Sequence, residues 1–200
     1  MTFTGLLWGA VFCGNIAFAA EQLPAELGDL VTASVERGVP GHLVEVKARE
    51  GLAKGVPIAS IRPVLDRLVD NLAAAQQMHE DADEVLLSTT AGALRAGASR
   101  SAIVEVGSSS PEARIRAIST LADLLRLHFA ERDAVRLTVR AAYTSNPQAS
   151  LIAVSETAGA LVAAGVVPRV AATQITRALD PGANDDELAA VQTANDGMSP

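Results

Sequence analysis

Apolar residues recur along the chain at the three- and four-residue spacing of amphipathic helices, and strand-type alternation is hard to find. The clearest stripe lies within residues 58–79, where six apolar side chains share one helical face: Ile61, Val64, Leu65, Leu68, Val69 and Leu72. Pro63 favours a helix start near Ser60, because proline removes a backbone donor from a helix interior. The pattern predicts an all-α fold.

Glycine and proline mark the junctions between these helices. Gly-Val-Pro occurs at 38–40 and again at 55–57. Glycine suits the left-handed position after a helix, and proline suits the first turn of the next one. Ser110 and Asn146 each precede a proline, which is a second kind of helix start. The predicted structural positions are Gly38, Pro40, Gly55, Pro57, Gly97, Pro111, Pro147, Gly165 and Pro168.

Three segments in the second half resemble one another. TTAGALRAGASRSAI (89–103) matches ETAGALVAAGVVPRVAATQI (156–175), and residues 119–139 lie between them with the same outline. Each unit predicts a longer helix, a glycine-centred corner and a shorter helix. Units of this kind, 30 and 37 residues apart, favour an irregular array of helical hairpins of the α-solenoid type. A compact multi-helix domain is the alternative.

Small residues inside the helices suggest close packing between helix backbones. Ala-Gly-Ala occurs at 91–93 and at 158–160, and Gly51 interrupts a helical segment. Beyond residue 20 the only aromatic residues are Phe129 and Tyr143. We therefore expect a core of aliphatic side chains at short interhelical distances.

The first twenty residues contain no charged residue and no histidine, and they hold the only Cys and the only Trp. An apolar run that ends in Ala17-Phe18-Ala19 is typical of a secretory signal peptide, with cleavage after Ala19. No basic residue precedes the run, so either the export signal is weak or the true start lies upstream. A buried N-terminal helix and a transmembrane anchor are the alternatives. The anchor is less favoured, because the run barely reaches the roughly 20 residues of a span. The sequence predicts a periplasmic or secreted protein with no stable membrane span after cleavage.

These features divide the chain into four parts. A signal peptide (1–19) precedes an N-terminal helical segment with two Gly-Val-Pro corners (20–79). The helix-pair repeats (80–183) follow, and a short helix with a disordered tail (184–200) ends the chain.

Composition excludes several kinds of chemistry. The formal net charge of −7 argues against nucleic acid and anionic membranes as partners. A mature chain without cysteine cannot form disulfides or use thiolate ligands and nucleophiles. The motifs G-x-S-x-G, the Walker loop and G-x-G-x-x-G are absent. We therefore predict no catalytic residue, no cofactor-binding residue and no cofactor.

Histidine and acidic residues provide one candidate metal site. His42, His79 and His128 lie far apart in sequence, so each is by default a solvated or core histidine. His79 with Glu80 and Asp83 is the remaining combination of ligand-type side chains. Acidic residues in this region also suit the first turn of a helix, where the helix dipole favours negative charge.

The segment KAREGLAKGVPIASI (47–61) resembles segments of uncharacterised secreted or envelope-associated bacterial proteins. In those segments a helix ends in Gly-Val-Pro and another helix begins. The resemblance implies an exported, all-helical bacterial protein, and it brings no activity or site residues.

We therefore expect an exported, non-catalytic helical interaction or structural protein of the bacterial cell envelope, with a protein or peptide as its partner. The alternative is a periplasmic small-ligand or metal-binding protein, or an enzyme, with a site between helices.

Overall fold

The computed structural model describes residues 22–79, 82–107 and 110–179. These residues form nine helices and contain no strand, which confirms the predicted all-α fold. The helices are α1 (Ala25–Glu36), α2 (Gly41–Ala53), α3 (Ile58–Met78), α4 (Glu84–Arg95), α5 (Arg100–Val106), α6 (Pro111–Arg126), α7 (Glu131–Ala142), α8 (Pro147–Ala163) and α9 (Pro168–Ala178). Within the described part of the chain, no helix is long and apolar enough to cross a membrane. The predicted signal peptide (1–19) and the short helix and tail (184–200) lie outside it.

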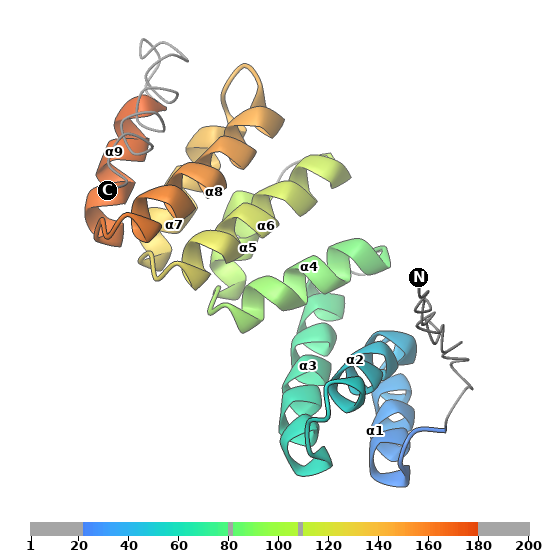
Figure 1. Ribbon diagram of the computed structural model, residues 1–200. Helices are drawn as coiled ribbons and strands as arrows, with labels where there is room; N and C mark the ends of the chain where they lie inside the picture. The colour runs from blue at the N-terminus through green and yellow to red at the C-terminus, as the bar shows by residue number, and fades with distance from the viewer. Residues whose placement is uncertain (1–21, 80–81, 108–109, 180–200) are drawn as a thin grey trace, which may run out of the picture.

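The helices form an extended array of hairpins. Figure 1 shows α4, α6 and α8 side by side, in a row that leads from α1–α3 at one end to α9 at the other. The shorter helices make a second layer, in which α5 contacts α7 and α7 contacts α9. Each longer helix is followed by its shorter partner, as in α4/α5, α6/α7 and α8/α9. This is the repeat of longer helix, corner and shorter helix that the sequence predicts.

Five helix junctions share one backbone conformation. The residue at each corner has a positive φ of 64–100°: Gly38, Gly55, Gly97, His128 and Gly165. At all five, the corner N–H donates to the carbonyl three residues back at 2.9–3.0 Å, and the next N–H donates to the carbonyl five residues back at 2.9–3.1 Å. This pair of hydrogen bonds is the Schellman motif, which satisfies carbonyls that the helix end would otherwise leave unpaired.

Counting from these corners reveals a common pattern of burial. The residue eleven positions before each corner is at most 7% exposed: Leu27, Val44, Leu86, Ala117 and Val154. The residue six positions after each corner is at most 4% exposed: Val44, Ile61, Ile103, Ala134 and Ala171. Each corner therefore fixes which face of the helix before it and of the helix after it enters the core.

His128 occupies a position that glycine holds elsewhere. Its φ of 64° places a non-glycine residue in the left-handed region, the single such case among the described residues. The following residue, Phe129, is 4% exposed and packs into the core. A buried aromatic side chain directly after the corner is a contact that typically accompanies this motif.

The prolines act as helix starts in two ways. Pro111, Pro147 and Pro168 are the first residues of α6, α8 and α9, as predicted. Pro40 and Pro57 instead stand one residue before α2 and α3, at the capping position. The first two Pro-led helices are also capped as predicted. Ser110 Oγ and Asn146 Oδ1 accept backbone N–H groups at 3.2 and 3.4 Å.

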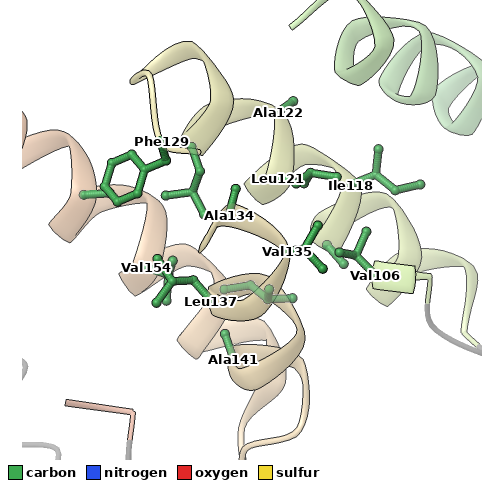
Figure 2. Close-up of a cluster of buried hydrophobic side chains, with 14 of the residues drawn as sticks. Val106, Ile118, Leu121, Ala122, Phe129, Ala134, Val135, Leu137, Ala141 and Val154 are labelled. Atoms are coloured by element: carbon green, nitrogen blue, oxygen red, sulfur yellow. The ribbon is translucent and has the colours of Figure 1, made fainter. Parts of the chain in front are cut away.

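Two sets of buried side chains hold the array together. The N-terminal set comes from α1–α3 and also includes Leu87 and Ala91 of α4. The larger set spans α4–α9. Figure 2 shows how α7 contributes to it in two directions, with Val135 pointing toward α5 and α6 and Leu137 toward α8. Helix α4 contributes to both sets, so it joins the two halves of the array.

Two local features predicted from the sequence lie where α2 meets α3. The helix predicted near Ser60 begins at Ile58, because the Pro57 carbonyl already accepts N–H groups from Ser60 and Ile61. Gly51 does mark a close approach, since a Cβ there would lie 2.9 Å from Ile61 Cδ1. The close approach at Gly51 therefore lies between α2 and α3.

The two Ala-Gly-Ala segments were expected to allow close packing between helix backbones, and this prediction was wrong for their glycines. A Cβ on Gly159 would meet no atom within 4 Å, and one on Gly92 would meet only an Arg126 nitrogen at 3.7 Å. The alanines Ala91, Ala93 and Ala158 are the buried members. Counted from their corners, the two Ala-Gly-Ala segments are also one residue out of register, so they are not equivalent positions.

Candidate functional site

A groove lies between α5 and α7, the two shorter helices at the centre of the array. It encloses about 720 Å³ and is lined by residues 99–105 of α5 and its cap and by residues 131–143 of α7. Three apolar side chains form part of its wall: Ala102, Val135 and Val139. Its lining combines apolar, charged and aromatic side chains.

The α7 side of the groove is a continuous helical stripe. Its members follow the spacing i, i+3, i+4, i+7, i+8 and i+11: Arg132, Val135, Arg136, Val139, Arg140 and Tyr143. This spacing places them on one face along the whole length of the helix. The groove therefore runs along α7 for about 18 Å, at 1.5 Å per residue.

The core holds α7 in the orientation that presents this stripe. Ala134, Leu137 and Ala141 are 0% exposed and lie in the α4–α9 core. Helix α7 is thus strongly amphipathic, with an apolar face turned to α6 and α8 and its arginines turned to the groove. Its first turn carries Glu131 and Asp133 and its last turn carries Arg140, which suits the helix dipole.

One hydrogen bond ties the two sides of the groove together. The Ser99 N–H donates to Glu131 Oε1 at 2.5 Å, joining the cap of α5 to the first turn of α7. Ser99 Oγ in turn accepts the Ala102 N–H at 3.1 Å and so caps α5. This hydrogen bond holds α5 and α7 together at the end of the groove where both helices begin. It also means that one carboxylate oxygen of Glu131 already has a hydrogen-bond partner.

The positive charges of the groove lie on one side. The three arginines of the stripe lie on α7, together with Glu131 at one end, whereas Glu105 lies on α5. Arg136 also pairs with Asp133 of its own helix at 2.9 Å, with half of its side chain exposed. Tyr143 stands at the end of the stripe with 87% of its surface exposed, the most exposed large apolar side chain among the described residues.

The structure does not assemble the predicted metal site. Asp83 serves as the cap of α4, where its carboxylate accepts the Leu86 N–H at 2.8 Å. Glu80 lies outside the described residues. Among the described residues, no group of three His, Cys, Asp or Glu side chains is placed to hold a metal ion.

The three histidines have separate surroundings. His42 of α2 pairs with Glu84 of α4 at 3.0 Å on the surface, and His128 forms a corner. His79 ends α3, and its Nε2 atom is buried without a hydrogen-bond partner in the described part of the chain. Burial, and secondarily the positive charge of Arg114, lower the pKa of His79 below its ordinary value of 6.5.

This environment makes stability depend on pH. The unfolded chain takes up a proton on His79 near pH 6.5, whereas the folded chain does so only at lower pH. We therefore expect the free energy of unfolding to fall as the pH drops below 6.5, and to level off below the folded-state pKa. Urea unfolding between pH 7.5 and 5 measures this slope. His79→Gln should flatten it, and the exposed control His42→Gln should keep it; equal slopes for wild type and His79→Gln would contradict the assignment.

The groove was not among the sites predicted from the sequence. A signal was present in Arg132, Arg136 and Arg140, since arginines at i, i+4 and i+8 must line one helix face. Sequence alone did not show that this face borders a second helix rather than open solvent. Comparison of the chain with family models, with curated proteins and with solved structures yields no match.

Proposed function

We propose that the protein is an exported, non-catalytic interaction module of the bacterial cell envelope, which binds an extended segment of a partner protein along the α5/α7 groove. The observation that carries the proposal is the stripe of arginine, valine and tyrosine side chains along the full length of α7. Export rests on the apolar leader that ends at Ala19.

The shape of the groove supports a peptide rather than a compact small molecule. A length of about 18 Å accommodates roughly five residues of extended chain, at about 3.3 Å per residue. Its wall combines apolar side chains with charged side chains at the rim, which is the usual anatomy of a protein interface. Tyrosine and arginine are the residue types that contribute most at such interfaces.

The fold supports the same function. Stacked helix pairs present extended surfaces that bind partner segments, and Figure 1 shows such an elongated array. Both α5 and α7 are anchored by buried side chains of the α4–α9 core, so the groove is formed before a partner arrives.

Substituting Val139 tests the proposal. Val139 is half-buried and lines the groove, so Val139→Asp places a charge on its apolar wall. We expect the full chain to capture a specific partner from envelope extract, and Val139→Asp to reduce that capture at least about tenfold, as expected for a charge buried at an interface. The control is Val170→Asp on α9, where the side chain is 51% exposed and lies away from the groove.

Unfolding midpoints of both variants show whether either is misfolded. Capture that survives Val139→Asp but is lost with Val170→Asp would place the interaction elsewhere. An intact chain that captures no specific partner would remove the proposal.

A further inference from the structure

We propose that the α5/α7 groove selects an extended segment with acidic side chains at alternate positions. The proposal rests on the proposed function, since it names the chemistry of the partner at the same site. It comes from the spacing of Arg132, Arg136 and Arg140 and from the distribution of charge across the groove.

The arginine spacing matches the repeat of an extended chain. Successive arginines are four residues apart on α7, which places them about 6 Å apart along the helix axis. In an extended peptide, side chains on one face recur every second residue, about 6.6 Å apart. Over three positions the two repeats differ by only about 1 Å, which flexible arginine side chains readily absorb. Three carboxylates at alternate positions can therefore each meet one guanidinium.

Arginine is well suited to this recognition. Its planar guanidinium can donate two parallel hydrogen bonds to one carboxylate, which adds geometric specificity to charge attraction. The existing pair of Arg136 with Asp133 is exposed and lies within one helix turn. Exposed pairs of this kind contribute little, so Arg136 can exchange this partner for a carboxylate in the groove at small cost.

The acidic residues of the groove set the orientation of the bound segment. Glu131 accepts the Ser99 N–H and is held at one end of the groove. Glu105 stands on the α5 side and repels carboxylates placed against that wall. The acidic face of the segment therefore turns toward α7, and the intervening side chains face α5, where uncharged side chains fit best.

Fluorescence anisotropy with three labelled peptides of equal length tests the proposal. One alternates glutamate with serine, the second has the same composition with its glutamates in one block, and the third replaces each glutamate with glutamine. We expect the alternating peptide to bind the full chain most tightly, the block peptide several-fold more weakly, and the glutamine peptide weakest. The affinity for the alternating peptide should fall as salt is raised, because exposed ion pairs are screened.

Arginine variants show whether α7 is responsible. Replacing Arg132, Arg136 and Arg140 together with glutamine should weaken binding of the alternating peptide roughly tenfold or more, as three surface pairs would. The matched control replaces three exposed arginines outside the groove with glutamine: Arg95, Arg169 and Arg177. The control should bind as the unsubstituted chain does.

The outcomes separate the two proposals. If all three peptides bound equally and Val139→Asp abolished their binding, the proposed selection of alternating acidic side chains would be wrong. The groove would still be a peptide-binding site. Equal loss in the groove and control arginine variants would also overturn the proposed selection, because net charge alone would then explain the binding. No binding by any peptide, together with partner capture that survives Val139→Asp, would overturn both.

Discussion

Alanine at Gly97 should destabilise the protein, whereas alanine at Gly159 should stabilise it. A Cβ would meet no atom within 4 Å at either position, so contacts with neighbouring side chains cannot explain a difference. Gly97 has a φ of 100° at a corner, while Gly159 lies inside α8. An L-residue in the left-handed region costs roughly 1–2 kcal/mol, partly offset because alanine restricts the unfolded chain. We expect a net loss of about 1 kcal/mol for Gly97→Ala.

Gly159→Ala should instead raise the free energy of unfolding by about 1 kcal/mol, the difference in helix propensity between the two residues. Chemical denaturation followed by circular dichroism measures both changes. The opposite signs of the two changes in unfolding free energy test whether Gly97 forms a left-handed corner. Stabilisation by Gly97→Ala would mean that residue 97 does not adopt the left-handed conformation.

Leu121→Ala should cause a larger loss, about 3 kcal/mol within a usual range of roughly 2–5 kcal/mol for a buried leucine. Leu121 is 0% exposed and belongs to the α4–α9 core, where it lies seven residues before the His128 corner. Figure 2 shows it among side chains of the buried cluster, and such surroundings relax only partly into the space that alanine would leave.

Val104→Ala is the matched control for this prediction, because its side chain is 69% exposed on α5. Its effect should lie within about 0.5 kcal/mol of zero. The same denaturation experiment compares the two variants. If Leu121→Ala costs no more than Val104→Ala, the packing described for α6 is wrong.

Much of the fold could be predicted because its signals are local. A corner needs only a residue that tolerates positive φ and a good helix start after it, and both are visible at Gly38 and Gly165 in the sequence. The corner at His128 could not be recognised by residue type, because residues other than glycine adopt positive φ in only a few per cent of cases. The structure identifies it through its hydrogen bonds to Leu125 and Leu124, which match those at the glycine corners.

Register was harder to predict than the repeat itself. The similarity of the two Ala-Gly-Ala segments suggested equivalent positions, but the distance of each segment from its corner differs by one residue. The buried positions lie at fixed distances from the corner residue and not at the positions where the two sequences are identical. The reason is that the end of the helix determines which of its faces meets the core. Counting from glycines with proline or small residues after them would have given the correct register.

The candidate site depends on contacts between units, which sequence patterns do not contain. The stripe on α7 was visible as a series of arginines, but its role requires α5 to lie alongside it. One contact that fixes this placement is the hydrogen bond from the Ser99 N–H to the Glu131 carboxylate, and the two residues lie 32 positions apart in sequence. The residues of the predicted metal site, in contrast, lie close together in sequence. That proximity did not produce a site, because Asp83 caps helix α4.

The central claim, that a partner segment binds along α7, is tested most directly by position-specific photo-crosslinking in cells. A photoreactive residue is placed at Tyr143, at the exposed end of the groove, and separately at Ile152, which is 39% exposed on α8 and does not line the groove. We predict a discrete crosslinked product from position 143 that Val139→Asp removes, and none from position 152. A product from position 152 with none from position 143 would contradict the account.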